Sequence, residues 1–572
     1  MRELSTDILI LGSGGAGLFA ALHAHKADAS LQITVAVKGL LGKCGCTRMV
    51  QGGYNVALAK EDSVERHFMD TIEGGKWLPD QELAWKLVTL AVERIRELEN
   101  ELGCFFDRNS DGSVHQKAFA GQTFDRTVHK GDLTGIEIIG RLAEQVWTRR
   151  ISRLEEFRAV ELITDKRNSA IAGVLFIDMR TGEYVLVRAK AVLLGTGGGP
   201  TMYKYHTPSG EKSCDGLAMA LRAGLPLRDM EMVQFHPTGL LAGTHTRMTG
   251  TVLEEGLRGS GGYLLNGAKE RFMPKYDPKA ERATRDFVSR AMYAEMRQGK
   301  TSPNGGLYIS MGHLDQDLVR RQFRGMVERC ADCGFDLAAG LVEVVPTAHY
   351  MMGGVEFAPD CSTVLKGLFV AGEDAGGVHG ANRLGGNGVA NSTVYGGVAG
   401  DAMAQWVAKE GAFREADQDQ IDAAVQRCEP RAGRSHGALE PLRERLYEVM
   451  WEKVGIIRTD AGLRSALSEL QSLEQDLSDA GIMGAERAFN LGWHDWLNLK
   501  NLAATSRVIA EAALARTDSR GAHFREDFPE AGPLEQSAFT SARLAGEKLQ
   551  IRMTPVAFTR VRPGQSLLRA NG

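Results

Sequence analysis

A six-residue loop near the start of the chain has the glycine spacing that dinucleotide chemistry requires. An apolar run at 7–11 precedes it and a helical pattern at 15–26 follows it. Glycines at these positions permit a tight turn and let a pyrophosphate approach the free N–H groups at the start of the helix. The loop consists of Gly12, Ser13, Gly14, Gly15, Ala16 and Gly17. The sequence therefore predicts a dinucleotide site here.

The end of the next predicted strand limits which dinucleotide can bind. In NAD-binding proteins an acidic residue at this position holds the ribose hydroxyls. This chain has Val37-Lys38 instead. Ordinary NAD binding is therefore disfavoured.

The eight cysteines are scattered thinly along the chain. Cys330 and Cys333 have metal or redox spacing, but no second pair and no histidine pair lies near them in the sequence, which favours plain thiols. The sequence has no cysteine cluster and no CxxCH haem motif. We therefore expect no metal in this chain, and any iron–sulfur centre or haem would sit on another polypeptide.

The elements that must position the loop are those of an α/β fold. Strand patterns at 7–11 and 31–37 enclose the first helix, strand patterns within 174–194 end on a second glycine turn, and 367–372 returns to a buried-strand pattern. Residues 240–345 are irregular and rich in Gly, Arg and Met, and helix-forming composition dominates from about 405 to 517. These patterns predict a Rossmann-like domain with a second domain inserted between two halves of its sheet, followed by a helical C-terminal domain.

Composition and charge exclude several functional classes. The 572 residues are 43% hydrophobic and 24% charged, as in ordinary multidomain enzymes. A net charge of -4 and a pI near 6.4 give no reason to expect a nucleic-acid partner. The first strand begins too early for a signal peptide, and no apolar run is long enough to span a membrane. We therefore expect a cytoplasmic chain, for which attachment to the inner face of the membrane through partner subunits stays open.

Three further segments match, in order, the motifs of one known family. They are Cys46-Thr47-Arg48-Met49-Val50-Gln51-Gly52-Gly53, Gly195-Thr196-Gly197-Gly198-Gly199 and the run from Gly367 to Glu373. With the first loop, they make the chain resemble the flavoprotein subunit of succinate dehydrogenase and fumarate reductase, a family that includes L-aspartate oxidase. The resemblance runs from residue 7 to about 530 and implies FAD as the cofactor.

The resemblance also implies a domain organisation. An FAD-binding domain would occupy 1–239 and 345–405, with a capping domain inserted at 240–344. A helical domain at 406–530 and a C-terminal segment at 531–572 would follow.

FAD contacts follow from the same resemblance. The glycine loop would hold the pyrophosphate, Lys38 fills the position of the family's own lysine, and 157–159 would flank the adenine. The implied FAD-binding residues outside the loop are Lys38, Cys46, Thr47, Gln51, Gly52, Gly53, Phe157, Arg158, Ala159, Thr196, Gly197, Asp215, Glu373, Gly388 and Val389.

A substrate constellation matches the family as well. There, residues matching His236, His349 and Arg383 hold the carboxylates of a small dicarboxylate, and the residue matching Arg285 transfers a proton. Two carboxylates in a dry pocket need charge-assisted donors, and an arginine can grip one of them with paired N–H bonds. Desaturating the carbon–carbon bond between them requires hydride transfer to flavin N5 and proton removal on the other face.

The proton step needs more than one residue. A free arginine is a poor base because its pKa exceeds twelve. Arg285 can therefore act only as a relayed proton shuttle, and Glu255 and Arg258 stand at the family's relay positions. Asp286 is expected to orient Arg285.

Cys46 departs from the family pattern. The membrane-complex members carry a histidine there that bonds covalently to the flavin, and this chain cannot form that histidyl bond. Two alternatives stay open: a thioether from Cys46 to the flavin 8α carbon, or non-covalent FAD beside a small thiol.

Glu254 is the second departure. The family places Thr or Ser before its Glu-Gly-x-Arg motif, where the hydroxyl helps hold a carboxylate, and Ser260 here replaces a usual glutamate. A carboxylate beside a carboxylate is repulsive unless one is protonated or a cation intervenes. Either Glu254 points away, or the substrate is a modified dicarboxylate whose amino, hydroxyl or other donor group meets Glu254.

Succinate and fumarate interconversion is the leading function. L-Aspartate oxidation comes second, because Phe119-Ala120-Gly121-Gln122-Thr123 resembles the dehydrogenase and reductase members more than the oxidase loop. A tRNA-modifying or scaffold flavoprotein would show a basic face and lack the histidine and arginine set. The resemblance leaves the electron partner open among an iron–sulfur subunit, a haem domain, a quinone and oxygen.

Overall fold

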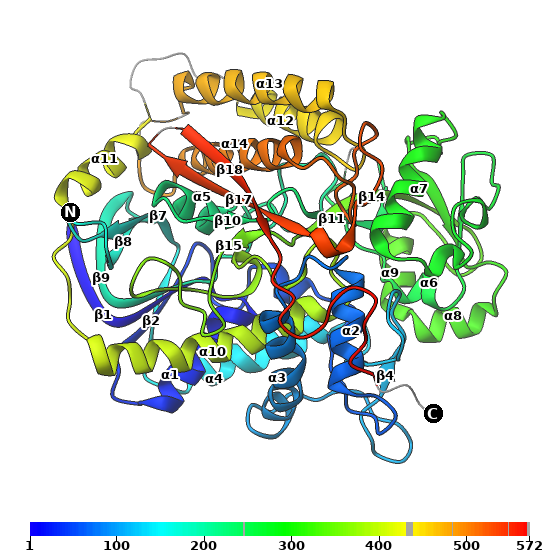
Figure 1. The fold of residues 1–572 in the computed structure, drawn as a ribbon, viewed down its shortest axis with the longest axis horizontal. Helices are drawn as coiled ribbons and strands as arrows, with labels where there is room; N and C mark the ends of the chain where they lie inside the picture. Colours follow the sequence, from blue (N-terminus) through cyan, green and yellow to red (C-terminus); the bar gives the residue numbers. More distant parts are fainter. Residues whose placement is uncertain (244–245, 431–438, 483, 485, 547, 569–572) are drawn as a thin grey trace.

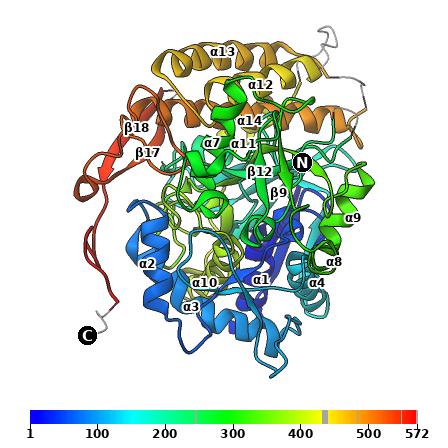
Figure 2. The same cartoon turned by 90° about the vertical axis from the view of Figure 1, so that its right-hand side faces the viewer.

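The computed structural model describes residues 1–568 except 244–245, 431–438, 483, 485 and 547. Figure 1 shows a central body built on a sheet, a helical layer above it, and a smaller unit to one side that carries α7 and α8. A hairpin near the C-terminus lies across the front of the body, and Figure 2 shows the last segment running down past α2.

The body is built on a seven-stranded sheet of order β6-β2-β1-β9-β8-β7, with β16 paired to β9. Its strands are β1 (Arg2–Leu11), β2 (Ile33–Val37), β6 (Ile151–Glu155), β7 (Phe157–Thr164), β8 (Ile171–Asp178), β9 (Glu183–Leu194) and β16 (Leu368–Val370). The pairs β1–β2, β1–β9, β2–β6 and β16–β9 are parallel, whereas β7–β8 and β8–β9 are antiparallel. The expected Rossmann-like α/β architecture is confirmed.

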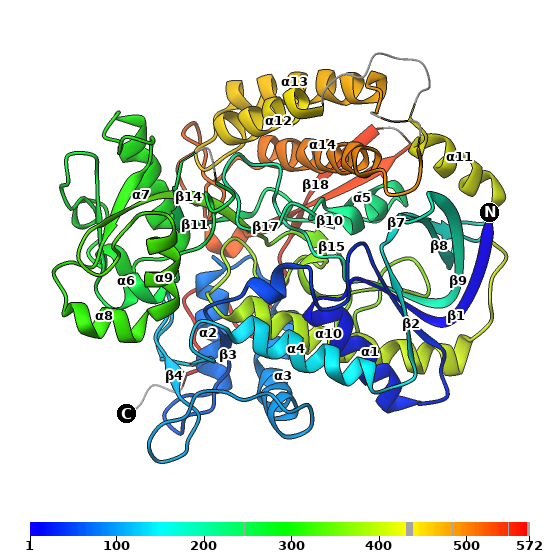
Figure 3. The same cartoon turned by 180° about the vertical axis from the view of Figure 1, so that it is seen from behind.

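Side chains of β1 alternate between two cores, as a strand covered on both faces requires. Ile8 and Ile10 pack with the helices on one face, and Leu9 and Leu11 pack with the core beneath the C-terminal helices. The helices of the first face are α1 (Gly15–Ala27), α3 (Gln81–Asn100), α4 (Thr134–Trp147) and α10 (Asn387–Glu410), with α2 (Val64–Gly74) beside α3. Figure 3 shows α1, α4 and α10 together along the lower edge of the body.

Helices α1 and α10 approach each other closely because α10 presents glycines to α1. A Cβ added to Gly396 would lie 2.6 Å from the carbonyl oxygen of Ala16, and one added to Gly400 would lie 2.4 Å from that of Ala20. Only glycine fits at such distances. This packing fixes the start of α1, where the predicted dinucleotide loop ends.

The inserted unit has its own sheet, of order β11-β14-β13-β12, and its own apolar core. Its elements are β11 (Val233–Leu240), α6 (Gly256–Gly259), β12 (Tyr263–Leu265), α7 (Arg285–Arg297), β13 (Leu307–Ser310), α8 (Gln316–Gln322), α9 (Arg324–Asp332) and β14 (Leu341–Met351). The expectation that 240–345 is irregular is therefore wrong, because short strands and many glycines hid an antiparallel sheet. Strands β11 and β14 cross both predicted domain boundaries and join this cap to the body.

The C-terminal part packs on the other face of the main sheet. Its helices are α11 (Gln418–Cys428), α12 (Leu439–Lys453), α13 (Asp460–Asp479) and α14 (Leu491–Ala515), and α5 (Asp215–Arg222) from earlier in the chain packs with them. A hairpin of β17 (Ala538–Ala545) and β18 (Lys548–Pro555) then joins β10 (Leu227–Arg228) and β15 (Gly354–Val355) in a second sheet. A third, small sheet contains β3 (Tyr54–Asn55), β4 (Gln116–Lys117) and β5 (Thr127–Val128).

Across the described ranges, no helix combines the length and the apolar character that crossing a bilayer would need.

Replacing the buried Arg516 should destabilise the folded chain. Its guanidinium lies 2.6 Å from Glu231 Oε1 and 3.4 Å from Asp229 Oδ1, and it donates to the carbonyl of Ala538 at 3.0 Å. Arg516→Met leaves two buried carboxylates without their shared cation. We expect the free energy of unfolding to fall by about 3–5 kcal/mol, as for other broken buried ion pairs.

Urea unfolding followed by circular dichroism measures this loss. The matched control is Arg464→Met, which removes an exposed ion pair to Asp460 and should leave the unfolding midpoint nearly unchanged, because water screens that pair. Equal unfolding midpoints for the two variants would contradict the structural role of Arg516.

Candidate functional site

The predicted glycine loop connects β1 to α1 and lies against the second glycine turn. Gly12 has φ +107°, and a Cβ there would lie 2.2 Å from the carbonyl oxygen of Gly195. A Cβ on Gly17 would lie 2.0 Å from the carbonyl oxygen of Gly12. Both positions therefore require glycine, and the first turn of α1 is left open toward a ligand.

Two cavities meet at this loop. The larger has a volume of about 470 Å³ and the smaller about 70 Å³, and Gly14, Gly195 and Lys212 line both. Such an elongated, two-part space suits a dinucleotide whose pyrophosphate sits at the helix start and whose two ends diverge from it.

The sequence-predicted residues divide between the two cavities. The larger cavity is lined by Gly14, Gly15, Ala16, Cys46, Thr47, Gln51, Gly52, Gly53, Gly197, His236, Glu254, Glu255, Arg285, His349, Glu373, Arg383, Gly388 and Val389. The smaller is lined by Gly12, Gly14, Lys38, Phe157, Ala159, Thr196 and Asp215. Gly17, Arg158 and Arg258 lie behind these walls.

Charged groups are fixed around the smaller cavity. Lys38 Nζ lies 2.7 Å from Asp215 Oδ2, and Arg158 lies 2.8 Å from Asp215 Oδ1. Burial raises the pKa of Asp215, but Arg158 and Lys38 together hold it well below its usual value. Arg158 does not line the smaller cavity, but its guanidinium is paired with Asp215, which does.

Three residues at this site were missed at the sequence level. Asp374 accepts hydrogen bonds from the backbone of the second glycine turn, including Gly197 N–H at 3.1 Å. Lys212 donates to the carbonyl of Thr196 at 2.6 Å. Ser392, at the start of α10, faces Gly15 and lines the larger cavity. Asp374 could have been found from the sequence because it follows the predicted Glu373. Lys212 and Ser392 belong to no recognised motif.

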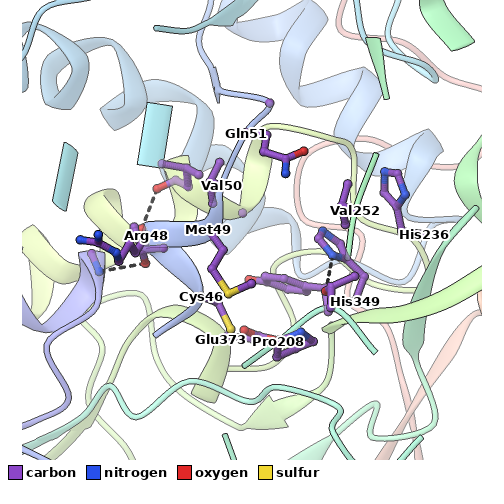
Figure 4. Close-up of a pocket in the computed structure, with 18 of the residues that line it drawn as sticks. Cys46, Arg48, Met49, Val50, Gln51, Pro208, His236, Val252, His349 and Glu373 are labelled. Carbon is purple, nitrogen blue, oxygen red and sulfur yellow. Dashed lines mark hydrogen bonds between the residues drawn. The ribbon is translucent and has the colours of Figure 1, made fainter. Parts of the chain in front are cut away.

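The larger cavity lies between the body and the cap. Figure 4 shows His236 and His349 on one side and Cys46 with Arg48 on the other. Gln51 Oε1 is buried without a hydrogen-bond partner among the described residues. An unpaired buried amide oxygen on a wall of glycines fits a flat, polar ring system such as the isoalloxazine of FAD.

Both histidines are neutral donors. Burial and the nearby guanidinium of Arg285 lower the pKa of His236 and of His349 well below the usual value. His236 Nδ1 accepts from Thr238 N–H at 3.3 Å, so its proton is on Nε2. The Thr207 hydroxyl lies 2.8 Å from His349 Nδ1, and when it donates, His349 also carries its proton on Nε2.

Glu255 holds Arg285 and Arg258 in one buried network. Arg285 donates to Glu255 Oε2 from Nε at 3.0 Å and from a terminal nitrogen at 2.6 Å, and Arg258 reaches Oε1 at 3.1 Å. Burial raises the pKa of Glu255, but the two arginines hold it below its usual value. The carboxylate is therefore ionised and can relay a proton between them.

The expectation that Asp286 orients Arg285 is wrong. Asp286 lies 3.6 Å from Arg290, one helical turn further along α7. Arg285 is instead oriented by Glu255 and by Gln234 Oε1, which accepts at 3.1 Å. Adjacent residues on a helix point in different directions, so sequence proximity misled here.

Arg383 is a buried cation whose Nε–H has no hydrogen-bond partner among the described residues. Its guanidinium stacks on the Tyr350 ring at 4.4 Å, and its Nε is buried without a partner in the described part of the chain. Burial and the nearby Arg285 lower its pKa to about 10, which still leaves it charged at neutral pH. A buried, incompletely paired guanidinium beside a cavity fits an anionic ligand.

Glu254 faces the cavity with a cation behind it. The side chain is 5% exposed and forms an ion pair with Lys117 of β4. Glu254 lines the cavity, but its Oε1 is paired with Lys117, which does not line it, so both alternatives for Glu254 stay open.

Comparisons with known proteins agree with this geometry. A family model described as FAD binding domain matches residues 7–389, and one described as fumarate reductase flavoprotein C-term matches 443–567. One subunit of the fumarate reductase (CoM/CoB) of Methanothermobacter marburgensis is 40% identical over 532 residues, which cover 92% of this chain and 95% of that protein. The fumarate reductase flavoprotein subunit of Escherichia coli is 34% identical over 547 residues, covering 92% and 89%. A solved structure of a mutant E. coli quinol fumarate reductase has a TM-score of 0.93 at 31% identity, and 99% of each chain is covered.

FAD should be released intact when the protein is denatured. Thioether formation needs a thiolate, and burial raises the pKa of Cys46 to about 12, which keeps the thiol protonated. Intact-mass measurement under denaturing conditions should give the mass of the polypeptide alone, with all flavin fluorescence in the small-molecule fraction. Flavin that stays with the chain, and is lost in Cys46→Ser, would establish the thioether instead.

Proposed function

Because the chain belongs to the family of succinate dehydrogenase and fumarate reductase flavoprotein subunits, we propose that it interconverts a saturated and an unsaturated small dicarboxylate, of the succinate and fumarate type, at bound FAD. The chain is an FAD-dependent oxidoreductase.

The charge of the substrate end of the cavity carries the proposal. Arg285, Arg258 and Arg383 bring three positive charges, Glu255 removes one, and both histidines are neutral. Glu254 and Lys117 cancel each other, and so do the charges of Asp132 and Arg329, which line the same cavity. The resulting charge of plus two matches a dianion, and the free Arg383 Nε supplies a donor for one of its carboxylates.

Substrate positioning follows from the donor directions. His236 and His349 present N–H groups from β11 and β14, and their ring centroids are 5.4 Å apart. Arg383, on the loop before α10, comes from the body. One carboxylate can therefore be held by each side, which leaves the carbon–carbon bond between them inside the cavity, whose lining includes Gly52 and Gly53.

The proton passes through Arg285. Bound FAD supplies the hydride acceptor or donor when the enzyme is loaded. Arg285 lines the cavity, so its guanidinium can give a proton to the carbon next to a carboxylate, and in the reverse direction it can take one after it has passed a proton to Glu255. Glu255, which is ionised, then passes a proton from Arg258 to Arg285, and Arg258 also donates to the carbonyl of Glu281 at 2.7 Å. This route removes the difficulty that arginine alone is a poor base.

We infer that electrons are exchanged with a separate polypeptide, such as an iron–sulfur subunit. Several relatives are named as subunits, among them the M. marburgensis protein. Met49, Leu133 and Ile136 support a contact at the rim of the cavity, because they line it and are 43–53% exposed. The cytoplasmic location, peripheral on the membrane through partners, stays a prediction that cell fractionation tests.

A dicarboxylate panel tests the proposed activity. The FAD-loaded chain should reduce a dye with succinate or oxidise a reduced dye with fumarate. Aspartate under air, with peroxide detection, tests the aspartate-oxidase alternative, and hydroxylated or amino dicarboxylates test the modified-substrate alternative. Absence of turnover with succinate and fumarate in both directions would overturn the proposal.

Arg285→Lys should lower kcat without changing the FAD content of the protein. The positive charge remains, but the paired bonds to Glu255 and the placement of the proton donor are lost. We expect kcat to fall by about 10²–10⁴-fold, the usual contribution of a positioned acid or base, with FAD content unchanged. Steady-state dye assays measure this.

Arg290→Lys is the matched control on the same helix. Arg290 contacts Asp286 and the carbonyl of Gly521 and does not line the cavity. Its kcat should stay at the wild-type value. Equal losses in both variants would point to damage to α7 rather than to a proton donor.

A further inference from the structure

Glu254 and Glu255 are neighbouring buried carboxylates with different partners. Glu255 is held by two arginines on the cap, whereas Glu254 Oε1 forms an ion pair with Lys117, which comes from the body. Glu254 also packs against Gly256, where a Cβ would lie 3.3 Å from Oε1. The Glu254 side chain thus has a defined position on the cavity wall.

Lys117 lies directly behind this wall. It is 18% exposed on its side chain, does not line the cavity, and has Nζ 3.5 Å from the carbonyl oxygen of Gly131. Its ammonium is also 5.7 Å from the ring centroid of Phe119, a residue of the cavity wall. The ammonium therefore sits where it acts on the cavity without touching a ligand there.

An unneutralised Glu254 would oppose the binding of a dianion. Like charges repel most strongly where water is excluded, and Glu254 is 5% exposed. Burial raises the pKa of Glu254 above its usual value, and the ion pair with Lys117 offsets only part of that rise. The positive charge of Lys117 therefore compensates the negative charge of Glu254 on the cavity wall.

We infer that Lys117 is a positioning residue for the substrate: by neutralising Glu254 it sets the charge of the cavity so that an unmodified dianionic dicarboxylate can bind next to a carboxylate side chain. This inference rests on the proposed function. Where the family pattern has a hydroxyl residue that helps hold a carboxylate, this chain would use the pair of Glu254 and Lys117.

A purely mechanical role for the pair is the competing explanation, since it joins the body to the cap. A second contact crosses the same boundary, because the Asp132 carboxylate lies against Gly325 at the start of α9, where a Cβ would be 1.9 Å from Asp132 Oδ2. The contact between the body and the cap therefore does not depend on Lys117 alone. The two roles predict opposite behaviour when both partners of the pair are removed.

The experiment compares three variants of the FAD-loaded chain by calorimetric titration with malonate and by steady-state kinetics with fumarate. Lys117→Met should weaken malonate binding and raise KM by about tenfold or more, with kcat changed much less, because an unpaired buried carboxylate then faces the dianion. Lys117→Arg keeps the charge and should bind like the wild type. Lys117→Met combined with Glu254→Gln removes both charges and should return affinity to within about threefold of the wild type.

Monomethyl fumarate, a monoanion, provides a second measurement. The loss of affinity in Lys117→Met should be smaller for it than for fumarate, because it carries one negative charge. Lys130→Met is the matched control, since Lys130 pairs with Asp107 outside the cavity and its loss should leave malonate binding unchanged.

The outcomes separate the hypotheses. Unchanged affinity in Lys117→Met, or a double variant as weak as the single one, would overturn the inference, and the second result would establish the mechanical role. A wild-type chain that binds no dicarboxylate would overturn the proposed function and this inference together. The content of bound FAD and the thermal transition of each variant verify folding. If Lys117→Met does not fold, malonate binding by the double variant and by Lys117→Arg tests the inference.

Discussion

The buried carboxylate of Glu255 is the interaction on which the cavity depends. Two guanidinium groups, from Arg285 and Arg258, would repel each other and would be costly to dehydrate if each stood alone. One ionised carboxylate between them makes a compact network with a net positive charge. The site can then hold an excess of positive charge in a space that excludes most water.

The rest of the architecture serves to bring other groups to this network. β11 and β14 present the two neutral histidines, and the loop before α10 brings Arg383 from the body. Glycines at 385 and 388 leave room for these arginines, because a Cβ at either position would lie about 3 Å or less from a guanidinium nitrogen. The glycine loop lines the same cavity from the body. The groups around the cavity therefore come from both the cap and the body.

Local patterns predicted much of this fold. The first strand, turn and helix, and the strand at 368–370, follow directly from apolar runs and glycines, since these depend on neighbours in the sequence. The sheet of the cap was missed because its strands are short and interrupted by glycine. The pair between Lys117 and Glu254, and the choice of Glu255 over Asp286 as the partner of Arg285, depend on contacts between distant segments, which periodicity does not encode. Motifs therefore located the site residues, while the tertiary structure determined which charges they meet.

The insertion of the cap between β9 and β16 has a consequence for how the protein is made. The main sheet gains β16 only after the whole cap has been synthesised, and α10, which closes the cavity and packs on α1, follows later still. Non-local pairing of this kind is slow, and until it occurs the edge of β9 and the apolar face of α1 stay uncovered. On the ribosome, most of the chain must therefore emerge before a cofactor can be enclosed. Chaperones and the supply of flavin would then act on a partly folded chain, which makes cofactor loading a late step of biogenesis.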